Sequence, residues 1–105
     1  MSSKEQHNIL AKELAHYTRA IGHPARIAVL LAIAAKGEGM VRDIVEVPPL
    51  SRATVLQHLR ELKRAGLILG KIYGAKTEYQ IDFKKLQDFD LSFKSFLQEV
   101  QVKNS

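Results

Sequence analysis

The chain has 105 residues, of which 46% are hydrophobic, and it contains no cysteine. This length predicts a single domain over residues 1–105 with a modest core. The lack of cysteine excludes disulfides, thiolate metal sites and cysteine redox sensing. No apolar run approaches the roughly 18 residues of a membrane span, and the first ten residues are polar where a signal peptide is apolar. We therefore expect no membrane partner and, by elimination, a cytoplasmic location.

The formal net charge of +5 is concentrated in one part of the chain. Residues 51–76 contain six cations and a single anion, Glu61, whereas cations and anions balance in the remainder. A chain that is neutral apart from one basic segment is typical of a protein with a polyanion-binding surface.

The first element is a predicted helix over residues 3–21, since its large apolar side chains recur at helical spacing. His7 and His16 are nine positions apart, so one helical face cannot present both to a metal, and we interpret them as surface or interface histidines. The predicted apolar stripe consists of Ile9, Leu10, Leu14, Tyr17 and Ile21.

A second helix is predicted over residues 24–36, because proline is favoured at the first helical position and Pro24 follows Gly22. Arg26 is the charged exception in this helix; it pairs with a carboxylate or lies at the solvent edge. We expect the buried face to consist of Ile27, Leu30, Leu31 and Ala34, widened by Val29 and Ile33.

A helix-turn-helix is predicted over residues 40–65. Its short first helix spans residues 40–46 and ends before the two prolines, Pro48 and Pro49, because a residue that precedes proline is pushed out of helical geometry. Its second helix begins at the N-cap Ser51 and stops at Gly66.

The second helix of this motif has two distinct faces. Val55, Leu59 and Leu62 form a narrow apolar stripe. The opposite face begins with small and amide side chains and continues with cations, an order that suits a helix in a DNA major groove. Most basic helix faces are simply solvated surface, but the neighbouring elements favour DNA binding. The opposite face consists of Ala53, Gln57, Arg60 and Arg64, with Arg52 and Leu56 at its edge.

A two-stranded hairpin is predicted over residues 67–82, with its turn at residues 74–76 and alternating side chains on the return strand. Lys71 and Lys76 make it basic. It is either a small sheet that covers the edge of the core or a DNA-contacting wing, and its place after the candidate recognition helix favours a wing.

The last predicted helix spans residues 83–102, with Asp82 as its N-cap. It holds all four phenylalanines of the chain, and a helix with so much aromatic surface must cover something. It could pack on its own domain, but we favour dimerisation through this helix and the first one. The residues expected at that interface are Leu10, Leu14, Tyr17, Leu86, Phe89, Phe93, Phe96, Leu97 and Val100.

Over residues 20–82 the chain resembles the ArsR/SmtB-type winged helix-turn-helix transcriptional repressors. Three segments carry the likeness: AIGHPARIAVLLAIA, similar to the second helix of the family; LSRATVLQHLRELKRAGLI, similar to its recognition helix; and GKIYGAKTEYQID, similar to its wing. The middle segment is the most specific. The resemblance implies a mainly α fold with about five helices and a two-stranded wing, in a homodimer joined through the first and last helices.

The resemblance also implies a cytoplasmic repressor that binds double-stranded DNA at an inverted-repeat operator and leaves it when an effector binds. Arg52, Ala53, Leu56 and Gln57 fall where the family reads DNA. Leu56 replaces a serine of many members, which exchanges a hydrogen bond for an apolar contact. With the other cations and hydroxyls, the expected DNA-binding set is Ser51, Arg52, Ala53, Thr54, Leu56, Gln57, Arg60, Lys63, Lys71 and Lys76.

The sequence departs from the metal-sensing members of this family. Their Cys-Val-Cys-Asp box is replaced here by residues 40–43, Met-Val-Arg-Asp, which lack both thiolates and add a cation. The last helix offers Asp88, Asp90 and Glu99 but no histidine, a set that suits a solvated face better than a zinc site. We therefore expect no metal and no cofactor, and the effector is left open: a small molecule, a protein or none.

Two other classes of function are alternatives to a DNA-binding repressor. A winged helix can also be a protein-interaction module whose basic face meets an acidic partner, with weak and sequence-blind DNA binding. An enzyme is not expected, since the sequence offers no nucleophile with a nearby base, no phosphate-binding loop and no convincing metal cluster.

Overall fold

The computed structural model describes residues 2–36, 41–42, 46–74 and 76–104. Within these ranges the chain forms four helices and a three-stranded sheet, and the molecule is elongated, with extents of 51 × 27 × 22 Å. The elements are α1 (Ser3–Ile21), α2 (Pro24–Ala35), β1 (Val41–Arg42), α3 (Arg52–Arg64), β2 (Ile68–Tyr73), β3 (Lys76–Ile81) and α4 (Phe83–Asn104).

The beginnings of the first two helices follow from their caps. Ser2 Oγ accepts a hydrogen bond from the backbone N–H of Glu5 at 3.2 Å, so α1 begins at Ser3. His23 caps α2 in the same way, because its Nδ1 accepts from the N–H of Ala25 at 3.0 Å, and Pro24 takes the first helical position. The predicted extents of these helices are confirmed to within one residue.

The predicted buried face of α2 is wrong at Ile27, Leu31 and Ala34, which are exposed, and confirmed at Val29, Leu30 and Ile33. Val29 and Ile33 are fully buried, with exposed fractions of 0% and 2%, whereas Ile27 and Leu31 are 45% and 64% exposed. Nearly every position of this helix is apolar, so its sequence defines no single buried stripe. Contacts with α3 and β3 select the face that contains Val29 and Ile33, which lie one helical turn apart.

The predicted helix over residues 40–46 is wrong at Val41 and Arg42, which form β1, and Glu46 lies outside any helix. Met40 and residues 43–45 lie outside the described residues. Strand β1 pairs antiparallel with β3, Val41 opposite Tyr79. The hairpin predicted from the sequence therefore becomes a three-stranded sheet of order β1-β3-β2, because the free edge of β3 provides unpaired backbone groups to which this segment adds.

The exit of α3 is a Schellman motif. The N–H of Gly66 bonds to the carbonyl of Lys63 at 3.0 Å, and the N–H of Leu67 bonds to the carbonyl of Leu62 at 3.1 Å. Gly66 has a φ of +85°, which side-chain-bearing residues rarely adopt, so the predicted stop at this glycine is confirmed. The turn sends the chain directly into β2.

The hydrophobic core lies where the second half of α1, α2, α3 and the base of the β2–β3 hairpin meet. In the hairpin Ile68 pairs with Ile81 at the base and Tyr73 with Lys76 at the tip. Only the base is buried, so the tip projects from the domain. The core cluster consists of Tyr17, Ala20, Val29, Ile33, Val55, Leu59, Leu62, Leu67, Ile68 and Ile81.

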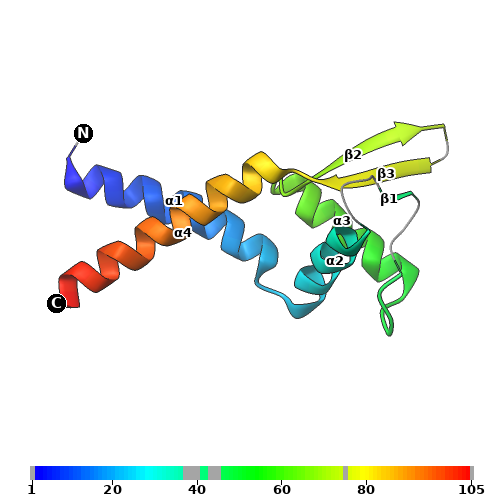
Figure 1. Cartoon of the computed structure of the whole chain (residues 1–105), viewed down its shortest axis with the longest axis horizontal. Coiled ribbons are helices and arrows are strands. Elements are labelled where there is room, and N and C mark those ends of the chain that lie inside the picture. The colour runs from blue at the N-terminus through cyan, green and yellow to red at the C-terminus, as the bar shows by residue number, and fades with distance from the viewer. Residues whose placement is uncertain (1, 37–40, 43–45, 75, 105) are drawn as a thin grey trace.

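Helix α4 leaves the sheet and crosses α1, so that both chain ends lie at the end of the molecule away from the sheet (Figure 1). As predicted, Asp82 caps α4, because its Oδ1 accepts from the N–H of Lys85 at 3.1 Å. Near the crossing, Tyr17 of α1 stacks on Phe89 of α4 with ring centroids 5.4 Å apart. We refer to the parts of α1 and α4 that lie beyond this contact, residues 3–14 and 93–102, as the arms.

Candidate nucleic-acid interface

Helix α3 is held by its apolar stripe and leaves its other face to solvent. Val55, Leu59 and Leu62 are at most 1% exposed. The predicted stripe is thus confirmed, and it orients the rest of the helix. Leu56 is half-buried at the edge of the exposed face. Every other predicted DNA-contacting residue of this segment is exposed, namely Ser51, Arg52, Ala53, Thr54, Gln57, Arg60 and Lys63.

At the beginning of α3, the hydroxyls of Ser51 and Thr54 are hydrogen-bonded to each other. Ser51 Oγ accepts from the N–H of Thr54 at 3.2 Å and lies 2.9 Å from Thr54 Oγ1. The first turn of α3 contains no acidic residue, so no side-chain carboxylate offsets the positive end of the helix dipole there. This end of the helix can therefore approach a phosphate or the edge of a base.

The cations on the exposed face of α3 differ in their partners. Arg64 forms an ion pair with Glu61, Nη1 to Oε1 at 3.1 Å, one turn back on the same helix. Within the part of the chain that the structure describes, Arg52, Gln57 and Arg60 form no hydrogen bond or ion pair through their side chains. These three side chains can therefore reorient toward a ligand without breaking a contact seen here.

Behind α3 lies a cluster that sequence analysis missed. His58 is buried, with 8% of its surface exposed. Its Nδ1 accepts a hydrogen bond from Arg26 Nε at 3.3 Å, and its ring lies 4.9 Å from that of His23. Burial lowers the pKa of His58 from 6.5, and the charges of His23 and Arg26 lower it further. A neutral His58 keeps the acceptor that Arg26 needs.

Arg26 also binds the end of α1, and so joins three helices. Its Nη1 donates to the carbonyls of Arg19 and Ala20 at 3.4 and 3.3 Å. Of the two alternatives for Arg26, a carboxylate partner is wrong, because its partners are carbonyls and an imidazole. Its position at the solvent edge is confirmed, since the residue is half-buried and its bond to Arg19 is exposed. No local pattern could reveal this cluster, since Arg26 and His58 are 32 positions apart.

The wing, the β2–β3 hairpin, lies beside α3. The tip of the β2–β3 hairpin and the beginning of α3 both lie at the end of the molecule opposite the termini (Figure 1). Lys71 is exposed, as is Ile72, at 75%. The side chain of Lys76 lies outside the described residues. Near the base, a Cβ on Gly70 would lie 3.5 Å from Lys63 Nζ, so the lysine of α3 passes close over the strand.

The predicted dimer residues divide into two groups. Leu14 and Tyr17 are buried within the protomer, Leu10 is half-buried on the same helix, and Leu86 and Phe89 pack against the core. The first half of α4 thus covers its own domain, which was one of the two alternatives. The second group lies on the arm of α4, where each residue is 41–43% exposed: Phe93, Phe96, Leu97 and Val100.

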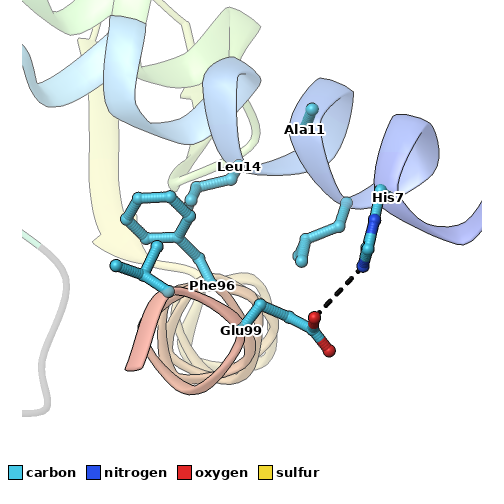
Figure 2. Close-up of a pocket in the computed structure, with 7 residues that line it drawn as sticks. His7, Ala11, Leu14, Phe96 and Glu99 are labelled. Carbon is cyan, nitrogen blue, oxygen red and sulfur yellow. Dashed lines mark hydrogen bonds and ion pairs between the residues drawn. The ribbon is translucent and has the colours of Figure 1, made fainter. Parts of the chain in front are cut away.

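An apolar groove of about 260 Å³ lies between the arms. Figure 2 shows Leu14 and Phe96 on its walls and His7 facing Glu99 at one end. His7 Nε2 and Glu99 Oε2 are 3.1 Å apart, which links the two helices across the groove. His7 is therefore a contact between the helices of the arms, as one of the interpretations of this histidine proposed.

The described residues contain neither a metal cluster nor a membrane-spanning helix. Among them there is no group of three or more His, Cys, Asp or Glu side chains that could hold a metal ion. No helix in the part that the structure describes is both long enough and apolar enough to cross a membrane.

Comparison with known proteins agrees with this architecture. A family model described as a helix-turn-helix domain matches residues 21–70, which run from the end of α1 into β2. An ArsR-like transcriptional regulator from Rhodococcus sp. RHA1 superposes with a TM-score of 0.69 at 18% identity, over 89% of this chain and 87% of that one. The predicted resemblance is confirmed at the level of the fold. The chain has an ArsR-type winged helix-turn-helix fold.

A second solved structure has the same ArsR-type architecture. It is described as a possible transcriptional regulator for arsenical resistance, and it superposes with a TM-score of 0.61 at 23% identity, over 83% of this chain and 93% of that one. No curated protein matches the chain. Together, the helix-turn-helix match and the two structures support a winged helix-turn-helix fold.

Proposed function

We propose that the protein is a dimeric, sequence-specific repressor that binds an inverted-repeat operator. The observation that carries the proposal is the placement of α3. Its apolar stripe is locked in the core, its exposed face carries amide and basic side chains, and its first turn lies at the same end of the molecule as the wing. A helix presented in this way can enter a major groove while the wing meets the flanking backbone.

The proposed contacts follow from exposure and chemistry. Gln57 and Arg52 read base edges, since amide and guanidinium groups pair bidentately with adenine and guanine. Thr54 Oγ1 is hydrogen-bonded to Ser51 and reads a base through its remaining donor or acceptor capacity. Leu56 and Ala53 supply apolar contacts, for instance to a thymine methyl. The proposed phosphate contacts are Ser51, Arg60, Lys63, Lys71 and Lys76.

The arms are the proposed dimer interface. They extend away from the core and expose Phe93 and Phe96, whose ring centroids lie 6.3 Å apart. The row continues toward the core to Phe89, 6.1 Å from Phe93. A row of this kind at the end of an elongated molecule suits a two-fold contact with a second copy. Two α3 helices would then enter successive major grooves about 34 Å apart.

The proposed repressor does not respond to metal. In place of the cysteine box, Arg42 adds a positive charge to a strand of the sheet. The effector, if one exists, is a small molecule or a protein.

The deciding experiment is a fluorescence-anisotropy titration with the DNA upstream of the protein's own gene. A scrambled duplex of equal length is the control, and both are measured at two salt concentrations. We expect the upstream DNA to bind at least about a thousandfold more tightly. Equal, weak and steeply salt-dependent binding to both would count against an operator at that locus and favour an acidic protein partner for the basic face.

A further inference from the structure

A second cavity lies behind α3, at the junction between the arm and the recognition helix. Its volume is about 300 Å³, and it opens between the last turns of α1 and α3. Ala20 and Ala65 are the small residues of its lining. The charged side chains of the lining come from Arg19, Arg26, Glu61 and Arg64, so this is a polar site, unlike the groove between the arms.

The C-terminal ends of two helices border this cavity, and their carbonyls would ordinarily repel an anion. Here those carbonyls already have donors. Arg26 Nη1 donates to Arg19 and Ala20 of α1, and His16 Nε2 donates to the carbonyl of Ala65 at 2.9 Å, just after α3. The negative ends of both helices are thus partly compensated by side chains of the lining itself.

The remaining charge around the cavity is positive. Three guanidinium groups face one carboxylate, and that carboxylate, Glu61, is paired with Arg64. The side chain of Arg64 is nevertheless 75% exposed, which leaves its other N–H groups accessible. Arg19 is exposed, and its guanidinium has no partner among the residues that the structure describes. Guanidinium groups are the donors best suited to bidentate recognition of phosphate.

We infer that this cavity binds a phosphate group between Arg19 and Arg64, above the fixed guanidinium of Arg26. The phosphate belongs either to the DNA backbone beside the recognition helix or to a free phosphorylated small molecule. The first source rests on the proposed repressor function, whereas the second does not. In both, the phosphate joins the last turn of α1 to the last turn of α3 and so couples the arm to the recognition helix.

The test begins on the protein without DNA. Inorganic phosphate is titrated against chloride at constant ionic strength, and backbone amide chemical shifts are followed by NMR. Saturable shifts at Ala20 and Ala65 are expected in the natural protein and in Lys12→Gln, the matched control, which removes an exposed cation of α1 outside the cavity. The same shifts should be lost in Arg19→Gln. They should also be lost in Arg64→Gln, which changes the α3 side of the cavity.

The source is then assigned from DNA binding by the same variants. If Arg19→Gln lowers the slope of log affinity against log salt by about one unit more than Lys12→Gln does, the cavity holds a backbone phosphate. If the slopes are equal but phosphate shifts the cavity amides, the ligand is a free anion. The inference would be overturned if phosphate leaves the amide chemical shifts of the cavity unchanged and Arg19→Gln and Lys12→Gln have the same salt slope, even if specific operator binding is intact. If phosphate causes saturable amide shifts but the protein binds no DNA sequence specifically, the phosphate site is supported and the proposed repressor function is refuted.

Discussion

Replacement of Arg26 by methionine tests whether one side chain joins α1, α2 and α3. Methionine keeps an apolar stem of similar length and removes three hydrogen bonds, to His58 Nδ1 and to the carbonyls of Arg19 and Ala20. The carbonyl of Arg19 regains water, because it is exposed. The buried imidazole nitrogen of His58 does not, and an unsatisfied buried acceptor costs about 1–3 kcal/mol.

The magnitude follows from these three contacts. All three distances, 3.3 to 3.4 Å, are long for N–H hydrogen bonds, so each contributes at the low end of its range. We therefore expect Arg26→Met to reduce the free energy of unfolding by about 2 kcal/mol. Operator affinity should fall as well, since the position of α3 relative to α1 is no longer held at this point.

Urea unfolding followed by circular dichroism measures this effect. The midpoint should fall with an unchanged m-value, which indicates a loss of stability rather than a more compact denatured state. The control is Lys12→Met, an exposed cation on α1, which should change stability by less than about 0.5 kcal/mol. A change as small as this in Arg26→Met, or strict additivity with His58→Gln, would refute the role of Arg26 as the link between the helices.

Four further predictions concern DNA, the dimer and pH. Gln57→Ala should weaken the operator by about 1–3 kcal/mol and alter preference at one position per half-site; an equal loss on random DNA would remove its base-reading role. Lys71→Ala should weaken all sequences alike and reduce the salt slope by about one unit, so an unchanged slope would mean that Lys71 makes no phosphate contact. Phe93→Glu should yield a monomer with much weaker operator binding, and sedimentation as an intact dimer would exclude this part of α4 from the interface. The lowered pKa of His58 means that the unfolded chain binds more protons below pH 6.5. Stability should therefore be complete above pH 6.5 and fall as the pH drops toward the folded-state pKa, by at most about 1.4 kcal/mol per unit. His58→Gln should lose less stability at low pH than His16→Gln does. An identical pH dependence of stability in both variants would contradict the assignment of this loss to His58.

Helix α3 could be predicted closely because its signals are local. Ser51 caps it through an N–H three residues ahead, Gly66 ends it through bonds that reach back along the same helix, and the stripe of Val55, Leu59 and Leu62 repeats within it. The sequence contained all of this information within about 16 consecutive residues. The same holds for the cap of α4 at Asp82 and for the wing strands, whose register follows from a short turn.

The segments that were predicted wrongly depend on partners far along the chain. Helix α2 is apolar nearly all round, so only its neighbours could decide that Val29 is buried and Leu31 exposed. Val41 and Arg42 join a strand almost 40 positions away, because that strand has a free edge. Short-range propensity contains no information about such an edge.

The basic character, the two faces of α3 and the wing were thus determined by the sequence itself, because each depends on contacts within one helix or one hairpin. The tertiary structure alone decided that Arg26 meets His58, that Tyr17 stacks on Phe89, and that three arginines surround a cavity between α1 and α3. These arrangements depend on the angles at which whole helices pack. Those angles follow from the summed contacts of many side chains rather than from the spacing of a few residues.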